Sequence, residues 1–487
     1  MRVLFASSEV APFAKTGGLA DVAGALPKAL QSLGHDVRVV LPKYRLVDTA
    51  RFGLRKILPK LVVPIAGTVE TCAVWEGRTG SVPTYFVEQD DYYDRDGLYQ
   101  SGGKDHPDNA ERFAFFSRVV LEISRALDFF PAVYHCNDWQ TGLVPAYLRS
   151  IYRVDPEVAG AGVLFTVHNL GYHGLFKPAA MAVANLSSDL FTPFGVEFYG
   201  KVNFLKAGLV FSDRINTVSR KYSQEIQTEE FGHGLDGVLR ARAKDVRGIL
   251  NGIDYDEWHP SRDQFIAARF SRDDLDGKAA CKADLQRIFG LPERADVPLL
   301  AVISRLAEQK GIDLIAESLD AILDLDTQFV LLGTGEPALH QAFEAAKARH
   351  PSRVGLKLGF DVALSHQIEA GADMFLMPSR YEPCGLNQMY SLAYGTIPIV
   401  RATGGLDDTI QPFEPDSGAG NGFKFAEASA DALLLAVGQA VALYRRREPW
   451  RRLIENAMAC DFSWSRSAKE YESLYHEIAS LRGAKGV

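Results

Sequence analysis

Short apolar runs alternate with amphipathic segments along most of this 487-residue chain. Each run is about as long as a buried strand, and each amphipathic segment has the spacing of a helix packed on one face. Strands that alternate with helices form parallel sheets covered by helices on both faces, because each crossover returns the chain to the same edge. The sequence therefore predicts an α/β fold.

The expected strands fall into two sets, on either side of a stretch beginning near residue 250 that lacks the alternation. The first set comprises 3–6, 37–41, 133–136, 162–167 and 214–218, and the second comprises 298–303, 328–332, 373–377 and 397–400. Helical spacing is clearest at 21–33, 109–127 and 464–481. A single core usually stops growing at about 250–300 residues, so two domains are expected. We place them at 1–248 and 249–460, followed by a helical segment at 461–487.

Composition narrows the class of protein. The net charge of −8 argues against broad binding to nucleic acid, although a local basic pocket remains compatible with it. The five cysteines are odd in number and widely spaced, which fits a reducing compartment. The longest apolar stretch, 432–444, is too short to span a membrane, and the N-terminal apolar run is too short for a signal peptide. We expect a cytoplasmic protein without membrane or nucleic-acid partners.

The motif Lys15-Thr-Gly-Gly-Leu-Ala-Asp21 lies between the first expected strand and the first helix. Paired glycines allow the backbone to approach a phosphate, and the start of a helix offers N–H groups to an anion. A tight turn between strand and helix remains the alternative. A second Thr403-Gly-Gly-Leu406 follows the strand at 397–400, so each half has one such turn.

A second motif, Ser304-Arg305-Leu-Ala-Glu-Gln-Lys310-Gly311, places two cations after the strand at 298–303. A diphosphate leaving group gains negative charge as its bond to sugar breaks. Arg305 and Lys310 could stabilise that charge without a metal ion, the first through a planar fork and the second as a point charge. Two solvated cations before a helix are the alternative, and the motif alone does not separate the two.

A third motif is Tyr381-Glu382-Pro-Cys384-Gly385-Leu386-Asn-Gln388. The Glu382 carboxylate could bind sugar hydroxyls and face an oxocarbenium-like transition state. Gly385 and Leu386 are expected to open the next helix and to offer N–H groups to phosphate. Cys384 is better explained as a small packing residue than as a nucleophile, since no histidine base lies near it in the sequence.

Two further polar residues follow expected strands of the first half. His168 ends the strand at 162–167, and either a structural or a functional role is open for it. Asp138 follows the strand at 133–136 and could equally be the N-cap of the next helix. No cysteine or histidine cluster predicts a metal site, and Asp90-Asp91 is only a weak signal for one. The loop 92–99 could offer tyrosine faces to sugar rings or pack on itself.

Taken together and in this order, these motifs resemble bacterial glycogen synthases and plant starch synthases, which use ADP-glucose. The resemblance runs through nearly the whole chain. It rests on segments 15–22, 108–113, 137–139, 167–169, 251–254, 304–306, 309–311, 382–386 and 403–406. It implies the GT-B architecture: two Rossmann-like domains facing each other across a deep cleft, with the C-terminal helix crossing back to the first domain. The first domain is then the acceptor side and the second the side of the nucleotide-sugar donor.

The resemblance also implies roles for individual residues. Arg305 and Lys310 hold the diphosphate, Lys15 closes over it, Glu382 contacts glucose, and His168 and Asp138 line the sugar pocket. The ring of Phe360 falls where the family stacks an aromatic residue on adenine. The expected substrate-binding set is Gly17, Gly18, Asn169, Gly335, Phe360, Cys384, Gly385, Leu386, Asn387 and Tyr390.

Tyr390 marks a departure from the wider class of related transferases, many of which have a second glutamate eight positions after the first. Synthases of this family tolerate the difference, but the ribose contact is left unassigned. The implied reaction moves glucose from ADP-glucose to the non-reducing end of an α-1,4-glucan such as glycogen, with retention of configuration. It needs neither a metal ion nor pyridoxal phosphate.

Three other classes of function compete with this one. An α-glucan phosphorylase needs a lysine for pyridoxal phosphate, and no strong candidate is present. A nicotinamide oxidoreductase needs a glycine fingerprint that residues 15–18 do not supply. A glucan-binding protein without activity would not need the charged motifs intact. Other GT-B transferases use UDP-glucose, and the choice of nucleotide rests on the resemblance alone. The oligomeric state is open.

Overall fold

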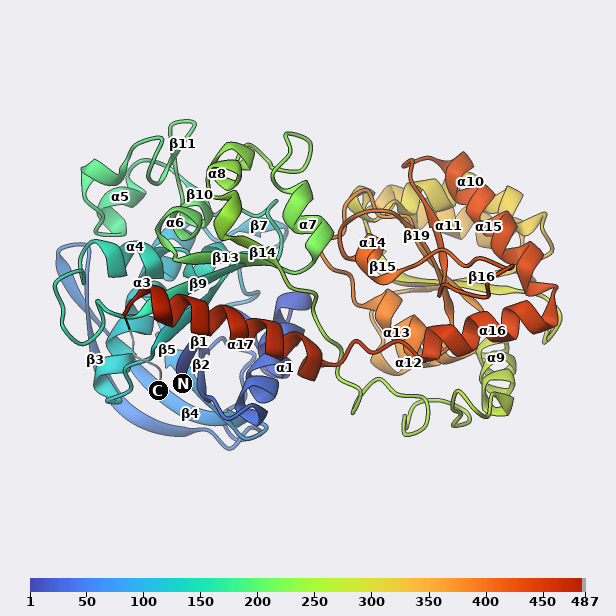
Figure 1. Ribbon diagram of the computed structural model, residues 1–487, viewed down its shortest axis with the longest axis horizontal. Coiled ribbons are helices and arrows are strands. Elements are labelled where there is room, and N and C mark those ends of the chain that lie inside the picture. Colours follow the sequence, from blue (N-terminus) through green and yellow to red (C-terminus); the bar gives the residue numbers. More distant parts are fainter. Residues whose placement is uncertain (484–487) are drawn as a thin grey trace. The chain divides into compact units, whose positions relative to one another are not determined.

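The computed structural model describes residues 1–483 and divides into two compact units, each built around a sheet. The N-terminal unit contains residues 1–218 and 223–252 together with the chain from residue 464 onward, and the C-terminal unit contains 219–222 and 253–463. The chain thus enters the C-terminal unit after Gly252 and leaves it before Trp464, where 248 and 460 were predicted as boundaries. Figure 1 shows both sheets with helices packed against them.

The sheet of the N-terminal unit has nine strands in the order β14-β13-β9-β8-β1-β2-β5-β4-β3. Neighbours from β14 to β5 pair in parallel, whereas β4 pairs antiparallel with both β5 and β3. In sheet order the strands are β14 (Val246–Gly248), β13 (Arg214–Thr217), β9 (Gly162–Val167), β8 (Val133–Asn137), β1 (Arg2–Ala6), β2 (Asp36–Pro42), β5 (Val82–Glu88), β4 (Thr68–Thr79) and β3 (Arg55–Ile65).

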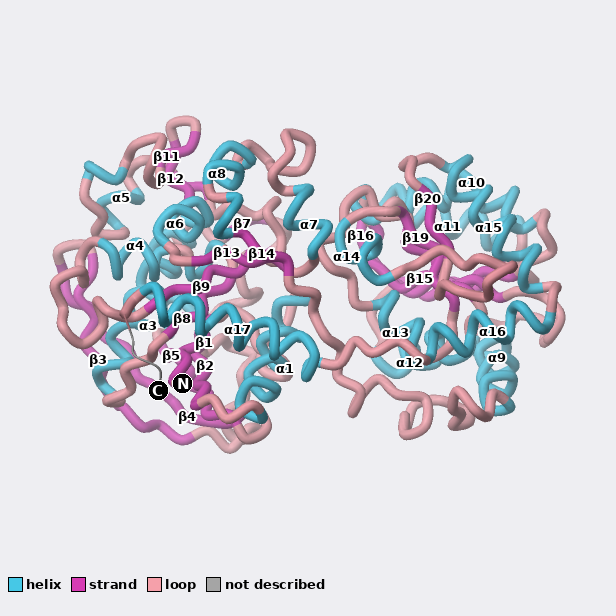
Figure 2. The backbone as a smooth tube through the Cα atoms, in the orientation of Figure 1, coloured by secondary structure: helices cyan, strands magenta, loops and turns pink. Residues whose placement is uncertain are grey.

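The N-terminal unit also has two small sheets, and its helices join or cover the strands (Figure 2). The small sheets are β10 (Leu175–Phe176), β12 (Lys201–Asn203) and β11 (Glu197–Phe198), and β6 (Gln100–Ser101) with β7 (Lys104–Asp105). The helices are α1 (Gly18–Ser32), α2 (Asp90–Tyr93), α3 (Asn109–Ala126), η1 (Trp139–Thr141), α4 (Leu143–Arg149), α5 (Ala180–Val183), η2 (Ser188–Leu190), α6 (Phe204–Phe211), α8 (Asp236–Ala241), η3 (Ala243–Asp245) and α17 (Trp464–Leu481). The short helix α7 (Arg220–Glu225) is divided between the two units after residue 222.

The C-terminal unit has a six-stranded, wholly parallel sheet in the order β17-β16-β15-β18-β19-β20. The strands are β15 (Leu299–Leu306), β16 (Gln328–Gly335), β17 (Val354–Leu358), β18 (Met374–Met377), β19 (Ile397–Arg401) and β20 (Phe423–Phe425). The helices are α9 (Asp276–Ile288), η4 (Glu308–Lys310), α10 (Ile312–Leu323), α11 (Pro337–Arg349), α12 (Val362–Gly371), α13 (Asn387–Ala393), α14 (Gly404–Thr409), α15 (Ala430–Tyr444) and α16 (Arg447–Met458).

Alternate residues of each buried strand in the C-terminal unit enter two different cores. Leu300 and Val302 of β15 belong to a large apolar cluster that also includes side chains of α10 and α15, whereas Leu299 and Ala301 belong to a second cluster with α9 and α12. Successive side chains of a strand point to opposite faces, so continuous apolar runs fill both cores at once. This is why apolar runs predicted β15, β16, β18 and β19, whereas β17 and β20 at the two edges of the sheet were not predicted.

The predicted α/β fold is confirmed, but the strands β5, β14, β17 and β20 were not among the predicted ones. The strand at 162–167 and the helix at 464–481 have exactly the expected bounds. The antiparallel β3 and β4 were not predicted, because β3 exposes much of its length and β4 alternates irregularly between buried and exposed residues. Within residues 1–483, no helix combines the length and apolar character that crossing a membrane requires.

The C-terminal helix α17 packs into the N-terminal unit, as the resemblance implied. Buried His135 of β8 contacts it through Nδ1, which lies 2.7 Å from the hydroxyl of Tyr475, while Nε2 lies 2.6 Å from the hydroxyl of Thr166. Gly162 of β9 has no room for a side chain, because a Cβ there would lie 2.2 Å from Ile478. The helix is therefore part of this unit's core and not an appendage.

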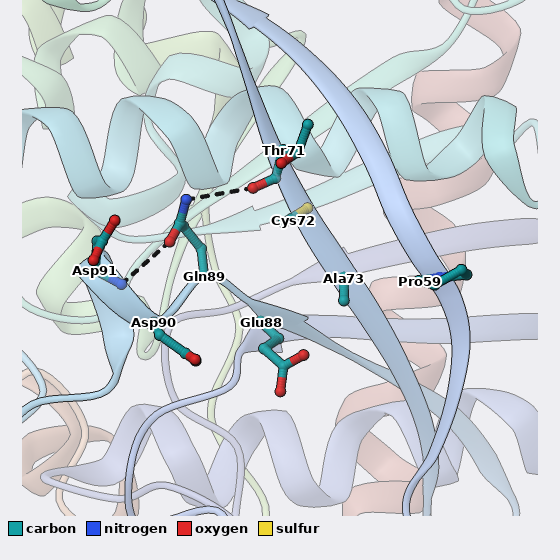
Figure 3. Close-up of a pocket in the computed structure, with 8 residues that line it drawn as sticks. All are labelled: Pro59, Thr71, Cys72, Ala73, Glu88, Gln89, Asp90 and Asp91. Carbon is teal, nitrogen blue, oxygen red and sulfur yellow. Dashed lines mark hydrogen bonds between the residues drawn. The ribbon is translucent and has the colours of Figure 1, made fainter.

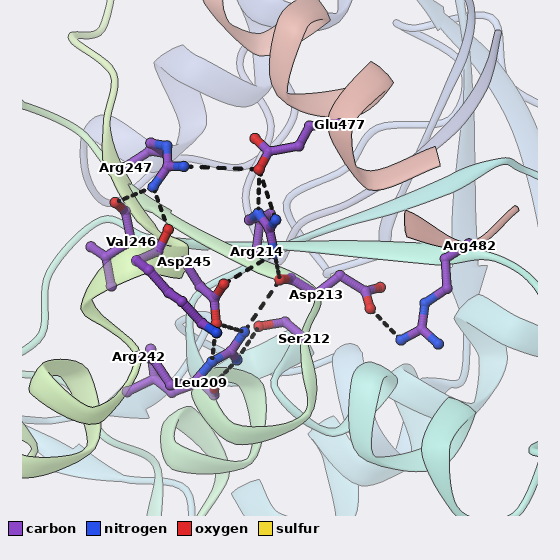
Figure 4. A network of polar contacts seen from close by, with 11 residues as sticks. Leu209, Ser212, Asp213, Arg214, Arg242, Asp245, Val246, Arg247, Glu477 and Arg482 are labelled. Atoms are coloured by element: carbon purple, nitrogen blue, oxygen red, sulfur yellow. Dashed lines mark hydrogen bonds and ion pairs between the residues drawn. The ribbon is translucent and has the colours of Figure 1, made fainter. Parts of the chain in front are cut away.

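Ion pairs also attach the end of α17 to this unit (Figure 4). The Asp213 carboxylate, 9% exposed, accepts hydrogen bonds from Arg149 and from the N–H of Val163, each at 2.7 Å, and pairs with Arg482. Nearby, Arg214 donates to Glu477 of α17 at 2.8 Å. A single buried carboxylate thus joins α4, β9 and the segment that follows α17.

Replacing Asp213 with Ala is expected to lower the free energy of unfolding of the N-terminal unit by about 3 kcal/mol, because it leaves the partly buried Arg149 cation and the N–H group of Val163 without their acceptor. The matched control is Asp96→Ala, which removes a carboxylate that is 81% exposed and paired with Arg45, and which should cost less than about 1 kcal/mol. Urea unfolding followed by tryptophan fluorescence measures both. Equal midpoints for the two variants would contradict the assignment of Asp213 as the anchor.

Candidate functional site

The segment after β1 is organised by a residue that sequence analysis did not single out, Glu9. Its carboxylate accepts the N–H groups of Thr16 and Gly17 at 2.5 and 3.1 Å, and the hydroxyls of Thr16 and Tyr99 at 2.6 and 2.8 Å. Glu9 is 4% exposed. It follows a parallel strand just as Asp138 does, and that position was the signal that could have identified it. The glycine turn thus already binds a carboxylate of the protein.

Lys15 and Gly18 lie where the motif predicted, at the start of α1, which begins at Gly18. The Lys15 ammonium is 2.6 Å from the Asp21 carboxylate, and its side chain is half exposed. Burial raises the pKa of the Asp21 carboxyl, although Lys15 opposes that shift. Lys15 is therefore held beside the glycine turn by Asp21, in the first turn of α1, and it remains open to solvent.

Asp138 and His168 are brought together by neighbouring strands, β8 and β9. Asp138 accepts the N–H of His168 at 2.7 Å, and its side chain makes no capping hydrogen bond to the helix η1 that follows. Asp138 thus occupies the N-cap position of η1, as the alternative predicted, but its carboxylate bonds to the segment after β9 and does not cap the helix. Burial raises the pKa of the Asp138 carboxyl to about 7, against the opposing effect of hydrogen bonds from the N–H groups of His168 and Asn169.

The His168 ring has a defined tautomer. Its Nε2 lies 2.9 Å from Oδ1 of Asn137, whose Nδ2 donates to the carbonyl of Ala6, so the oxygen of Asn137 must accept and Nε2 must donate. Burial lowers the pKa of His168 to about 3, which keeps the ring neutral at physiological pH. Nδ1 is then a hydrogen-bond acceptor, suited to a hydroxyl and not to a phosphate.

Asp138→Asn is expected to change how stability depends on pH. The folded-state pKa of Asp138, about 7, lies above the usual 3.8, so its stabilising contribution is complete below pH 3.8 and is lost as the pH rises to about 7. Asparagine keeps the acceptor oxygen but cannot ionise. The variant should therefore gain stability relative to the parent protein as the pH rises from 5 to 8. Thermal unfolding at each pH measures the difference, and parallel curves for the two proteins would refute the shifted pKa.

In the C-terminal unit, Lys310 and Glu382 form a close ion pair. Lys310 ends η4, after β15, and its ammonium is 2.5 Å from the Glu382 carboxylate, which follows β18. The side chain of Glu382 is 8% exposed and that of Lys310 is 21% exposed. Ser379 also donates to Glu382, at 3.1 Å. Two motifs 72 residues apart in the sequence thus meet at the carboxyl edge of one sheet, as predicted.

The other donor-side motif residues lie on the same loops. Arg305 is exposed at the end of β15 and donates to the side chain of Gln309 at 3.2 Å. Asn387 begins α13 and donates to the carbonyl of Ile303 at 2.9 Å, which joins α13 to β15. Gly385 has a φ of +71° and Leu386 is the N-cap, so these two residues open the helix as expected. Cys384 is buried, in agreement with a packing role.

Gly335 and Phe360 lie at the ends of the neighbouring strands β16 and β17. A Cβ at Gly335 would be 2.2 Å from the carbonyl of Leu306, so close backbone approach explains this glycine. Phe360 is 83% exposed, the highest exposure among the candidate site residues that are aromatic. Tyr390 is half-buried on α13 and stacks on Trp258, with ring centroids 3.9 Å apart. Trp258 was not predicted, and it lies far from Tyr390 in the sequence.

The second glycine turn, at 403–406, packs against the loop that holds Glu382. A Cβ at Gly404 would lie 1.8 Å from the carbonyl oxygen of Glu382, and one at Gly405 would lie 2.0 Å from that of Cys384. Gly404 also has a φ of +47°, whereas a Cβ at Gly17 would have no atom within 4 Å. The two turns therefore have the same sequence, but their glycines are needed for different structural reasons.

Gly404→Ala is expected to lower the free energy of unfolding of the C-terminal unit by about 2–4 kcal/mol, because it forces the backbone at Glu382 to move and strains a left-handed residue. Gly17→Ala meets no such obstacle and should cost about 1 kcal/mol or less, mainly through the weaker N-cap. Chemical denaturation of both variants measures the contrast. A Gly404 variant as stable as the Gly17 variant would contradict the packing role.

The tyrosines of loop 92–99 are not free to stack on sugars. Tyr93 is fully buried, the Tyr92 hydroxyl donates to Glu70 at 3.0 Å, and the Tyr99 hydroxyl donates to Glu9. The alternative that this segment packs on itself is therefore the better description. Tyr99 in turn contributes to the organisation of the glycine turn.

An open pocket of about 310 Å³ lies at the antiparallel edge of the N-terminal sheet (Figure 3). It is lined by Pro59, Thr71, Cys72, Ala73, Glu88, Gln89, Asp90 and Asp91. None of the predicted catalytic or substrate-binding residues lines this pocket. Across residues 1–483, no group of three or more histidine, cysteine, aspartate or glutamate side chains is placed to hold a metal ion, the Asp90-Asp91 pair included.

Both units of the chain match known protein families. Residues 2–241 match the starch synthase catalytic domain, and residues 286–458 match the glycosyl transferases group 1 family. The chain is 51% identical to glycogen synthase 1 of Geobacter sulfurreducens, over 100% of this chain and 98% of that protein. It is 49% identical to the glycogen synthase of Syntrophotalea carbinolica, over 99% and 100% of the two chains.

Among solved structures, the catalytic domain of starch synthase IV from Arabidopsis thaliana, bound to ADP and acarbose, superposes with a TM-score of 0.91 at 37% identity. The match covers 98% of this chain and 99% of that one. Sucrose-phosphate synthase from Thermosynechococcus elongatus shares the fold, with a TM-score of 0.58 at 18% identity.

The two α/β units and the full-length structural match define the chain as a GT-B glycosyltransferase. More closely, it belongs to the family of bacterial glycogen synthases and starch synthases, and it is an enzyme of that kind. The fold class and the class of activity predicted from the sequence are thereby confirmed.

Proposed function

We propose that the chain transfers glucose from ADP-glucose to the non-reducing end of an α-1,4-glucan, with retention of configuration. The observation that carries this proposal is the Lys310–Glu382 pair, which places a cation and a carboxylate side by side at the carboxyl edge of one parallel sheet. Such a pair can serve both halves of a nucleotide sugar, the cation facing phosphate and the carboxylate facing glucose.

In this proposal the C-terminal unit binds the donor. Arg305 and Lys310 neutralise the charge that grows on the diphosphate as the bond to glucose breaks. Arg305 is exposed and its guanidinium donates to the side chain of Gln309, so it can turn toward a ligand, whereas Lys310 must share its charge between Glu382 and the phosphate. The N–H groups of Gly385 and Leu386 at the start of α13 are further phosphate donors.

Glu382 is assigned to the glucose. Its carboxylate is nearly buried and is held by Lys310 and Ser379, so it is oriented before substrate binds. A fixed carboxylate can accept hydrogen bonds from sugar hydroxyls and stabilise positive charge that develops at the anomeric carbon. Cys384 and Asn387 hold the loop on either side of Gly385 and complete the wall of this site.

The N-terminal unit supplies the acceptor side. The neutral His168 ring, with Nδ1 as an acceptor, together with Asp138 and Asn169, suits sugar hydroxyls. Lys15 and the turn at Gly17 and Gly18 would contact the donor phosphates once the hydrogen bonds to Glu9 exchange for phosphate. No step of this reaction requires a metal ion or pyridoxal phosphate.

The choice of ADP-glucose rests on the adenine side of the donor. Phe360 offers an exposed ring for stacking, Gly335 ends the next strand, and Tyr390 lies on α13. The starch synthase IV structure with ADP and acarbose supports the same nucleotide and an α-glucan-like acceptor for this chain. ADP release with a glycogen primer, measured with ADP-glucose and with UDP-glucose in turn, tests the assignment. Faster turnover with UDP-glucose would reject it.

Lys310→Ala and Arg305→Ala are each expected to lower kcat/KM by about 10²–10³-fold, because each removes a charge that stabilises the leaving diphosphate. Arg287→Ala is the matched control, since Arg287 is a surface cation of α9 paired with Asp284 and Glu293. Initial rates of ADP release report activity, and thermal unfolding checks that each variant is folded. Near-normal glucan synthesis by a folded Lys310 or Arg305 variant would refute the role of the cations.

A further inference from the structure

Three aromatic rings from three parts of the C-terminal unit form a parallel stack. The indole of Trp258 stacks on the ring of His366 of α12, with centroids 3.8 Å apart and planes 8° from parallel. It also stacks on the ring of Tyr390 of α13, with centroids 3.9 Å apart and planes 12° from parallel. Two rings this close to the indole cannot share one of its faces, so Trp258 lies between them. We call these three residues the ring stack.

A second residue near Trp258 in the sequence, Asp263, also contacts both helices. Its buried carboxylate lies 2.7 Å from Nδ1 of His366 on α12 and accepts the hydroxyl of Tyr394 on α13 at 2.5 Å. Burial opposes ionisation, but the hydrogen bonds from His366 and Tyr394 lower the pKa of the Asp263 carboxyl below its ordinary value. One segment therefore joins α12 to α13 twice, by ring stacking and by hydrogen bonds.

The segment that contains both residues is long and irregular. Residues 249–275 join β14 to α9 without a regular helix or strand. Irregular segments longer than about 12–15 residues are uncommon in compact domains and usually have a functional role. The residues of this segment that pack on α12 and α13 therefore require an explanation beyond the connection of two elements.

The separation of α12 from α13 is not set by direct pairing of the strands that precede them. Helix α12 follows β17 and α13 follows β18, and the sheet places β16 and β15 between these two strands. The two helices nevertheless lie side by side (Figure 1), and the hydroxyl of Ser391 on α13 donates to the carboxyl of Glu369 on α12 at 2.6 Å. Side-chain contacts, those of the ring stack included, therefore determine how far apart the helices lie.

The first residues of these two helices belong to the proposed donor site. Phe360 directly precedes Asp361, the N-cap of α12, whose side chain accepts the N–H of Leu364 at 3.0 Å, so Phe360 moves with α12. Gly385 and Leu386 directly precede α13. In the proposed function, Phe360 contacts adenine and the other two contact the diphosphate. A ligand that reaches both places depends on the distance between the helices.

We propose that Trp258 is a positioning residue for the nucleoside diphosphate of the donor, because it holds α12 and α13 at the distance that one ligand spans. The proposal rests on the proposed function for the identity of that ligand. When two contacts are fixed in place, a ligand that has made the first makes the second with little further loss of freedom. A ligand that reaches only one contact gains nothing from the fixed distance.

Trp258→Leu is expected to raise the Kd for ADP by about 10-fold, because the base and phosphate contacts are no longer held in register. The Kd for inorganic pyrophosphate, which has no base, should change by less than about 2-fold. Isothermal titration calorimetry on the full chain measures both constants. KM for ADP-glucose should rise as the Kd for ADP does, with kcat and KM for glycogen unchanged. Trp258→Phe keeps a stacking face and should bind ADP within about 3-fold of the parent protein.

Two further variants separate positioning from general damage. Trp450 of α16 is buried in the same unit and packs edge to face on Tyr444, with centroids 5.1 Å apart. Trp450→Leu should lower the thermal unfolding midpoint and leave the Kd for ADP unchanged. His366→Leu removes the ring on the other side of the indole and should raise the Kd for ADP by about 3-fold. It tests the same prediction if Trp258→Leu does not fold.

Unchanged ADP affinity in a folded Trp258→Leu variant would overturn the proposal. Equal losses of ADP and pyrophosphate affinity would overturn it too, as would the same loss of ADP affinity in Trp450→Leu. Failure of the proposed function is seen separately, in the parent protein, as ADP binding without transfer of glucose from ADP-glucose. The two dissociation constants then still decide the role of Trp258. A parent protein that binds no ADP would overturn both proposals.

Discussion

Parallel strands covered on both faces leave only their ends available for chemistry, and that constraint determines where function lies in each unit. In the C-terminal unit, alternate residues of β15 fill two separate cores, so no strand interior can face a ligand. The reactive side chains therefore come from the loops after the strands, where Lys310 follows β15 and Glu382 follows β18. Asp138 and His168 follow β8 and β9 in the N-terminal unit for the same reason.

In both units a carboxylate of the protein already binds the groups that an anionic ligand would use. Glu9 accepts the N–H groups of Thr16 and Gly17, and Glu382 accepts Lys310. Such contacts keep these donors oriented when no ligand is bound. In the proposed function, the donor diphosphate takes the place of the protein carboxylate as the acceptor of these hydrogen bonds. Binding of the diphosphate then adds little desolvation cost.

The sequence predicted those elements whose local pattern gave one strong signal. It did not predict features that depend on contacts between residues far apart in the chain. The strand 162–167 and the helix 464–481 were predicted to the residue, because apolar runs and amphipathic spacing are local signals. The half-exposed β3 has no clean period, so it was missed. Glu9 was missed because its partners lie up to 90 residues away, and Trp258, in the segment between β14 and α9, was missed because its stacking partner Tyr390 lies far away in the sequence, on α13.

The two Thr-Gly-Gly-Leu segments show why a motif must be judged by its surroundings. Around Gly17 there is open space, and its backbone is extended, so the absence of a side chain leaves room for a ligand. Gly404 instead lies against the carbonyl of Glu382 with a φ of +47°, so its missing side chain is required by packing. The same four-residue sequence therefore suits a turn open to an anion in one unit and a support for the Glu382 loop in the other. A role carried over by sequence similarity alone would have assigned phosphate to both.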